Sequence, residues 1–289
     1  MPCYLNPDLH CHSDVSDGTL SPEEVAARAK ANGVDLWALT DHDEAGGQQR
    51  ALAAARALGL DCLTGVEISV SHADTTVHIV GLGFDPTDAR MLDGLANTRD
   101  GRGPRAVEMG EQLARAGIRG AYEGALRHVG NPALISRTHF ARFLVEAGVC
   151  RDTAEVFRNY LVEGKPGYVP HRWARLADAV HWITESGGVA IVAHPARYDF
   201  SAAEEYALFC EFKQHGGQGV EVVTGSHTAM EARRYADLAR EFELAASRGS
   251  DFHSPDESRI DMGRLPPLPA DLTPVWTLLE SRIHRAQLH

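Results

Sequence analysis

The stretch Asp8–Pro22, DLHCHSDVSDGTLSP, places two histidines and three aspartates behind the first expected strand, which runs to about Leu9. His10 and His12 share one face of that strand because side chains alternate along it. Crowding ionisable groups at one place costs stability unless something binds them. The stretch therefore predicts a metal site at the end of the first strand, with Asp17 reaching it across a loop.

The overall composition is that of an ordinary globular protein, with 44% hydrophobic and 24% charged residues. No apolar run approaches the roughly 20 residues that span a bilayer, and the N-terminus lacks the layout of a signal peptide. We therefore expect a cytoplasmic protein without a membrane partner. The net charge of −12 argues against binding to duplex nucleic acid, whose partners are normally basic. The five scattered cysteines form no CxxC pair and predict no thiolate zinc site.

Strand and helix signals alternate over most of the chain. Ser21 and Pro22 supply the N-cap and first-turn proline of a helix after the opening stretch. Further strands are expected at 34–42, 61–70, 75–84, 188–195, 219–225 and 244–253. Such alternation with helices predicts βαβ units and a parallel sheet. Seven strands favour an α/β barrel over an open sheet, and the chemistry of such barrels lies at the C-terminal ends of the strands.

One part of the chain departs from this alternation. Residues 85–165 have little strand signal and several helical stretches separated by glycines and prolines. We interpret them as a helical insertion domain, carried by a barrel domain formed by residues 1–84 and 166–289. A short helix is expected near 274–285.

Almost every expected strand carries a histidine or a carboxylate at the functional end of the barrel. These residues are His10, His12, Asp17, His42, Glu67, His78, His194, Asp251 and His253. Histidine and carboxylate ligands without thiolates suit divalent ions such as Mn, Zn or Fe. One ion takes about four to six ligands, so the set predicts two or three ions.

The motifs DLHCHSDVSDG, LTDHD, TGVEIS, AHP and GSDFH, in this order, resemble those of the PHP (polymerase and histidinol phosphatase) superfamily. The resemblance implies a distorted (β/α)7 barrel with a trinuclear metal site at its C-terminal rim. It implies that one ion is held by His10, His12, Glu67 and Asp251, a second by Glu67, His78 and His194, and a third by Asp17, His42 and His253. Asp17 stands where some members have histidine. We also expect Asp41 to accept a hydrogen bond from a ligand histidine.

The expected insertion resembles that of one particular group within the PHP superfamily. NPALISRTHFARFLVEAG (131–148) and YLVEGKPGYVPH (160–171) are similar to the insertion of bacterial PHP phosphoesterases that act on nucleoside 3′,5′-bisphosphates. Some relatives of that group trim short 5′-phosphorylated RNA. The expected activity is metal-dependent removal of the 3′-phosphate from a nucleoside 3′,5′-bisphosphate, such as 3′-phosphoadenosine 5′-phosphate, with a small nucleotide or a short RNA end as partner.

Seven residues receive expected roles in this reaction. Arg137 and Lys165 are the candidate phosphate ligands, because arginine binds phosphate bidentately and lysine as a point charge. Tyr168 or His171 would contact base or sugar. His227, at a strand end, would contact the phosphate or act as a general acid. The catalytic residues expected besides His227 are the metal ligands Glu67 and His194.

Two other classes of function stay open at this stage. The chain could be a 5′-3′ exoribonuclease or a histidinol-phosphate phosphatase, and the rates on the three substrates decide between them. It could also be a PHP module that has lost catalysis and serves as a scaffold. Degenerate modules lose ligands, whereas all nine ligand positions are filled here.

Overall fold

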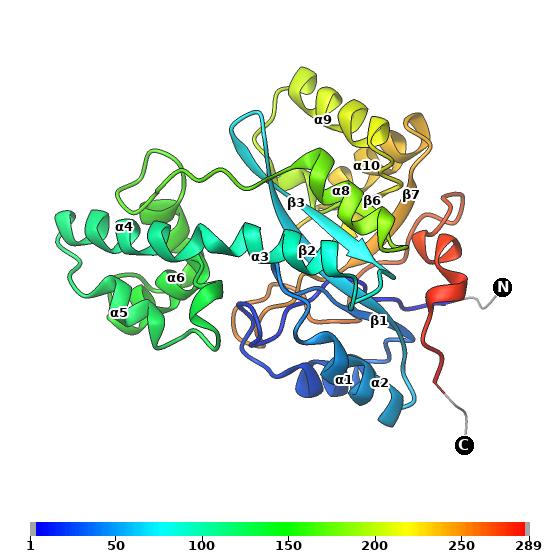
Figure 1. The fold of residues 1–289 in the computed structure, drawn as a ribbon, viewed down its shortest axis with the longest axis horizontal. Helices are drawn as coiled ribbons and strands as arrows, with labels where there is room; N and C mark the ends of the chain where they lie inside the picture. The colour runs from blue at the N-terminus through cyan, green and yellow to red at the C-terminus, as the bar shows by residue number, and fades with distance from the viewer. Residues whose placement is uncertain (1–3, 287–289) are drawn as a thin grey trace.

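The computed structural model describes residues 4–286, which fold around one curled sheet with the order β1-β2-β3-β5-β6-β7 (Figure 1). The short β4 pairs with β2 off this path. The strands are β1 (Leu36–Leu39), β2 (Asp61–His72), β3 (Thr75–Leu82), β4 (Ala174–Arg175), β5 (Val189–Val192), β6 (Gly219–Thr224) and β7 (Ala245–Gly249). The expected distorted α/β barrel is confirmed.

The opening stretch closes this barrel, but not as the regular strand that was expected to run to Leu9. It makes isolated bridges instead, from Asp8 to Trp37 on one side and from Cys11 to Phe252 on the other. Gly249 is needed for this closure, because a Cβ there would lie 2.2 Å from the Cβ of His10. The first segment of the chain therefore lies between β1 and the end of β7.

The expectation of an all-parallel sheet is wrong for β3, which runs antiparallel to both β2 and β5. β2 and β3 form a hairpin whose two turn residues, Ala73 and Asp74, have φ of 46° and 58°. Two-residue turns with positive φ match the twist of paired strands. His78 faces Ser69 in this hairpin. It therefore comes from the first half of its strand, and not from a C-terminal strand end.

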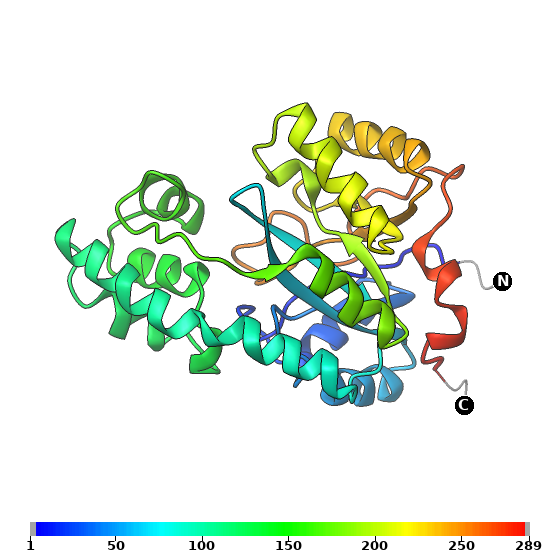
Figure 2. The ribbon, with the colours of Figure 1, turned by 45° about the horizontal axis from the view of Figure 1, so that its top comes forward.

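Two groups of helices cover the sheet. In Figures 1 and 2, α1 (Pro22–Ala31) and α2 (Gln48–Ala57) lie on one side, and α8 (Leu176–Glu185), α9 (Ala202–Gln214) and α10 (Ala229–Glu241) lie on the other. The Ser21 prediction is confirmed, since Ser21 caps α1 in a capping box with Glu24. The short helix expected near 274–285 is instead two 3₁₀ turns, Val275–Leu278 and Glu280–Arg282. No helix in the described part of the chain is long and apolar enough to cross a membrane.

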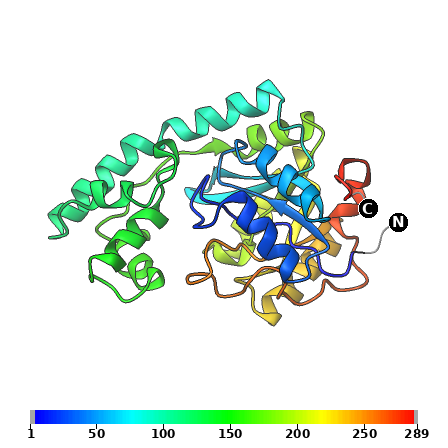
Figure 3. The same ribbon diagram turned by 90° about the horizontal axis from the view of Figure 1, so that it is seen from below.

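The helices of the middle of the chain form a lobe on the side of the molecule away from the termini (Figure 3). They are α4 (Arg102–Arg115), α5 (Ala121–Leu126), α6 (Arg137–Glu146), α7 (Thr153–Val156) and the π-helix Phe157–Leu161, and α3 (Ala89–Asp100) leads to them from the barrel (Figure 1). From Ala106 to Val169 the buried side chains share a hydrophobic core of their own. Met91 and Leu95 of α3 belong to the core of the barrel. The boundaries of the insertion domain stay a prediction.

Candidate metal centre

The nine side chains predicted as metal ligands converge at one end of the barrel. The ligand atoms of eight of them form three overlapping groups, in each of which all atoms lie within 4.8 Å of one another; His194 belongs to none of the groups. The groups are His10, His12, Glu67 and Asp251; His42, Glu67 and His78; and His12, Asp17, His42 and His253. The first matches the predicted set. The others add His42 or His12 to the predicted sets, and the second lacks His194.

Glu67 lies at the centre of this cluster and is fully buried. Its Oε1 is 2.9 Å from His78 Nδ1 and 2.9 Å from His194 Nε2. Its Oε2 is 3.0 Å from His42 Nδ1. A carboxylate surrounded by imidazoles on both oxygens has the arrangement of a ligand that bridges two ions.

The first group brings two ring nitrogens against each other. His10 Nε2 and His12 Nε2 are 3.2 Å apart, and Asp251 Oδ1 lies 3.1 Å from His12 Nε2. Glu221 faces the Nδ1 of His10, which leaves the lone pair of Nε2 directed at His12 and Asp251. A cation between the two rings would satisfy both nitrogens.

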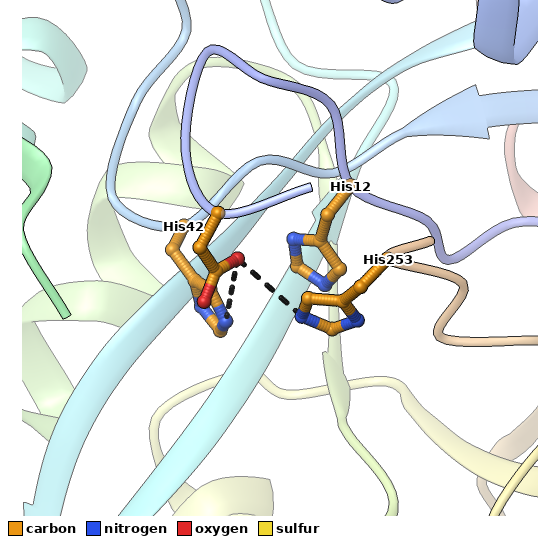
Figure 4. Close-up of side chains that lie close together, drawn as sticks. His12, His42 and His253 are labelled. Carbon is orange, nitrogen blue, oxygen red and sulfur yellow. Dashed lines mark ion pairs between the residues drawn. The ribbon is translucent and has the colours of Figure 1, made fainter. Parts of the chain in front are cut away.

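In the third group, the ring of His12 stacks on the rings of His253 and His42. The ring centroids of His12 and His253 are 4.1 Å apart, and those of His12 and His42 are 4.5 Å apart. Figure 4 shows the three rings pointing toward one another, with dashed lines for ion pairs. Asp17 Oδ1 completes the group at 3.4 Å from His253 Nε2 and 3.9 Å from His42 Nε2.

Several buried polar atoms of this cluster have no hydrogen-bond partner among the described residues. They are His12 Nδ1, Asp17 Oδ1, His42 Nδ1, Glu67 Oε2 and Asp251 Oδ2, and all but the first lie within ion-pair distance of a neighbouring side chain. A buried polar atom without a partner costs roughly 1–3 kcal/mol. Ligation of divalent ions would remove that cost, so the residues present fit a metal centre.

The electrostatics of Glu67 and His194 favour the protonation states that metal ligands need. Burial would raise the pKa of Glu67, but the charges of His78, His42 and His10 outweigh burial and hold it well below its usual range. Burial lowers the pKa of His194 to about 4. Metals bind anionic carboxylates and neutral imidazoles, so both groups are ready to bind without releasing a proton at neutral pH. His12 differs: burial lowers its pKa, but contacts with Asp251 and Glu67 outweigh burial and raise it to about 10, so a metal would displace a proton there.

Two acidic residues support the cluster from behind. Glu221 of β6 is fully buried, with Oε1 2.9 Å from His10 Nδ1 and Oε2 accepting from the backbone N–H of His194 at 2.8 Å. Sequence reasoning missed it, although a lone glutamate in the apolar strand GVEVVTG was a signal. The expectation that Asp41 accepts a hydrogen bond from a ligand histidine is wrong. Asp41 accepts from Ser13 N, Ser13 Oγ and Ser16 Oγ and so orders the loop before Asp17.

The backbone is strained where two of these side chains leave their strands. His194 has φ of 26° and Asp251 has φ of 55°. Residues other than glycine rarely adopt positive φ, and such residues cluster at functional sites where the surrounding structure holds them.

A pocket of about 170 Å³ lies over the cluster, and four arginines line it: Arg102, Arg105, Arg137 and Arg197. The first three come from the helical lobe. Arg102 and Arg105 both lie over the Trp173 ring, at 4.8 Å and 5.3 Å. Only Arg137 was predicted. The spacing of Arg102 and Arg105, three residues apart and so on one helix face, was a signal for the other two in the lobe.

The other predicted substrate residues lie elsewhere. Lys165 is exposed and does not line this pocket. Tyr168 and His171 line a separate cavity of about 670 Å³. His227 lines a third cavity, where its Nδ1 donates to Val222 O at 3.1 Å and its Nε2 accepts from Ala196 N at 3.4 Å.

Comparison with known proteins agrees with this geometry. Residues 8–160 match the family model of the PHP domain. A 3′,5′-nucleoside bisphosphate phosphatase of Chromobacterium violaceum is 50% identical over 97% of this chain and 98% of its own length. A 5′-3′ exoribonuclease of Haemophilus influenzae is 41% identical over 93% of this chain and 97% of its own length.

A solved structure gives the same result in three dimensions. An amidohydrolase from Chromobacterium violaceum, with bound sulfate and no metal, superposes with a TM-score of 0.94 at 50% identity. The match covers 97% of this chain and 98% of that one. The resemblance seen in the sequence is confirmed: this chain belongs to the PHP domain family.

Proposed function

We propose that the chain is a metal-dependent phosphoric monoester hydrolase that removes the 3′-phosphate of a nucleoside 3′,5′-bisphosphate. One observation carries the proposal: the ligand cluster and an arginine wall, formed by Arg102, Arg105 and Arg137, share one pocket. The pocket can therefore hold two phosphates of one small molecule, one at the ions and one at the guanidinium groups, chiefly those of Arg105 and Arg137 because Arg102 already pairs with Asp43. The 50% identical relative is named for this activity.

Two or three divalent ions would be held by the nine side chains, with Glu67 bridging. When bound, such ions lower the pKa of water, clamp the phosphate oxygens and neutralise charge as the transition state forms. Mn, Zn and Fe all suit these ligands. Glu221 would orient the ring of His10, and the strained backbone at His194 and Asp251 would aim their side chains at the ions.

The arginine wall would set which ester is cleaved. Guanidinium groups bind phosphate oxygens in pairs and are charged at neutral pH, although burial lowers the pKa of Arg105 to about 9. With the 5′-phosphate on the wall, the 3′-phosphate reaches the ligand cluster. The oxygen of water joins the phosphorus, the P–O3′ bond breaks, and the 3′-oxygen takes a proton. The products are the 5′-monophosphate and phosphate.

The test is phosphate release by purified protein loaded with Mn²⁺. We expect 3′-phosphoadenosine 5′-phosphate to react at least about tenfold faster than 3′-AMP, which has nothing to offer the arginine wall. Histidinol phosphate also carries a single phosphate and should be poor for the same reason. Absence of phosphate release from the bisphosphate would overturn the proposal. A catalytically inactive scaffold would bind much less than two equivalents of metal.

A second activity has an observation in its favour. The 41% identical relative is named a 5′-3′ exoribonuclease. Hydrolysis of the first internucleotide bond of a short 5′-phosphorylated RNA breaks the same P–O3′ bond as the bisphosphate reaction. One site of this kind can therefore support both reactions, provided that the RNA beyond the cleaved phosphorus has somewhere to lie.

A further inference from the structure

A second cavity, of about 310 Å³, continues from the metal pocket. The two share five lining residues: Thr138, Phe157, Arg197, Asp251 and His253. Beyond these, the second cavity is lined on one side by Thr153 and Ala154 of α7, and on the other by Ser226, Ser258 and Arg259 of the barrel loops. We call it the downstream cavity.

We propose that the downstream cavity binds the second nucleotide of a short 5′-phosphorylated oligonucleotide while the first lies in the metal pocket. The inference rests on the proposed function, because it takes the arginine wall as the place of the 5′-phosphate. It adds a binding site and a residue, Arg259, that the bisphosphate reaction does not use.

The positions of the lining residues support a path for the oligonucleotide from the arginine wall, past the ligand cluster, into the downstream cavity. Arg102, Arg105 and Arg137 line the metal pocket and do not line the downstream cavity. Asp251 and His253, at the ligand cluster, line both. A chain with its 5′-phosphate on the wall and its first internucleotide phosphate at the cluster therefore continues into the downstream cavity. The cavity beside Tyr168 and His171 shares no lining residue with the metal pocket, so it offers no such path.

The chemistry of the walls suits a nucleotide. The hydroxyls of Thr153 and Ser226 can bond to sugar and phosphate oxygens, and Phe157, between the two cavities, offers a ring on which a base can stack. Phe157 begins a single turn of π-helix, a distortion that is frequent at functional sites.

The charges in the downstream cavity leave one cation for a further phosphate. Glu257 is neutralised by Arg142, in a paired contact of 2.9 Å and 2.7 Å. Arg197 pairs with Asp251. Arg259 is exposed and, within residues 4–286, forms no ion pair. In a protein of net charge −12, such an arginine is suited to the phosphate that follows the cleaved one.

The reaction itself repeats in this arrangement. Water's oxygen joins the first internucleotide phosphorus, the P–O3′ bond breaks, and the 3′-oxygen of the first nucleoside takes a proton. The first product is a 5′-mononucleotide. The phosphate stays on the second nucleotide, so the remaining chain again carries the 5′-phosphate that the arginine wall binds.

Two substrates separate this inference from the proposed function. The experiment measures kcat/KM of the Mn²⁺-loaded protein on 3′-phosphoadenosine 5′-phosphate and on a 5′-phosphorylated RNA trinucleotide. For Arg259→Gln we expect a fall of about tenfold on the trinucleotide, as for the loss of one charge-assisted contact, and no change on the bisphosphate. Arg119→Gln is the matched control, because Arg119 is an exposed arginine of the helical lobe that lines neither cavity.

A steric variant tests the same cavity independently of charge. Ala154→Trp adds a large side chain at an exposed position that lines the downstream cavity. We expect at least a tenfold fall on the trinucleotide, with the bisphosphate rate kept. Ala114→Trp, at an exposed helical position outside both cavities, should change neither rate.

Each outcome has one meaning. Wild-type protein that hydrolyses the bisphosphate but not the trinucleotide overturns the inference alone, as do Arg259→Gln and Ala154→Trp variants that keep the wild-type trinucleotide rate. Wild-type protein that cleaves the trinucleotide but not the bisphosphate overturns the proposed function, and the two variants then still decide about the cavity. Failure on both substrates overturns both.

Discussion

Glu221 Oε1 lies 2.9 Å from His10 Nδ1, so the ring of the first histidine is fixed by a buried carboxylate from the opposite part of the chain. Carboxylates behind ligand histidines set the tautomer and raise the basicity of the ligand nitrogen. We therefore expect Glu221→Gln to weaken metal binding about 10–100-fold, as measured by Mn²⁺ titration calorimetry. Glu205→Gln, which changes another buried glutamate that contacts Arg234 and Tyr235, should bind metal as the wild type does. Equal affinity of Glu221→Gln and wild type would contradict the role.

Glu67 contacts His78, His194 and His42, which belong to more than one of the predicted ion sites. Glu67→Gln keeps the shape of the side chain but removes its charge. We expect the bound metal, counted by emission spectroscopy, to fall by at least one equivalent. Phosphate release should fall by at least about a hundredfold, because even the loss of a residue that only hydrogen-bonds to a metal ligand lowers activity by up to about a hundredfold. A variant that retains full metal content and activity would show that Glu67 does not bridge.

Arg137 should act on the substrate and leave the metal unchanged. Its guanidinium carbon lies 5.7 Å from the centroid of the Phe157 ring, in the wall of the metal pocket. We expect Arg137→Gln to raise KM for the bisphosphate about tenfold or more, at unchanged metal content, while leaving 3′-AMP hydrolysis as it is. The measurement is the ratio of kcat/KM for the bisphosphate to kcat/KM for 3′-AMP. Equal effects on both would place the 5′-phosphate away from this wall.

His139 makes stability depend on pH. Burial lowers its pKa to about 4, and its Nδ1 accepts from Ser136 N at 3.0 Å in the capping box of α6. Between about pH 6.5 and pH 4 the unfolded chain binds a proton at this site and the folded chain does not, so the free energy of unfolding falls as pH falls.

His139→Gln supplies a residue that caps in the same way and does not titrate. On going from pH 7 to pH 5, metal-free wild type should lose about 2 kcal/mol more of its free energy of unfolding than this variant. Urea denaturation at the two pH values measures the difference, and the titration of the ligand cluster cancels between the two proteins. Parallel losses would exclude His139 as the cause.

The ligand cluster could be predicted from sequence because its residues follow local rules. His10 and His12 alternate along one chain segment, and Asp251 and His253 do the same. The direction of β3 could not be predicted in this way, since the alternation of side chains is the same in either direction and the turn at Ala73 and Asp74 lacks the usual glycine or asparagine.

Residues of the pocket walls depend on how distant elements pack. Arg102 and Arg105 reach the site because Arg102 contacts Asp43 and the β2 residue Ser69 and both arginines lie over Trp173. The spacing of the two arginines on one helix face does not predict these contacts. His227 follows a strand end, as predicted, yet its ring turns to the Val222 carbonyl and lines another cavity. Strand position therefore predicts where the backbone lies better than it predicts where a side chain points.

The barrel closes where its first segment meets its last strand, and the ligand cluster lies across that seam. His12 and Asp251 are 239 residues apart in the sequence, yet His12 Nε2 lies 3.1 Å from Asp251 Oδ1. The first group of ligands is therefore complete only after the two ends of the chain have met, late in synthesis. Metal uptake reports that the whole barrel has closed, and a chain that stops before Asp251 lacks a member of both the cluster and the seam.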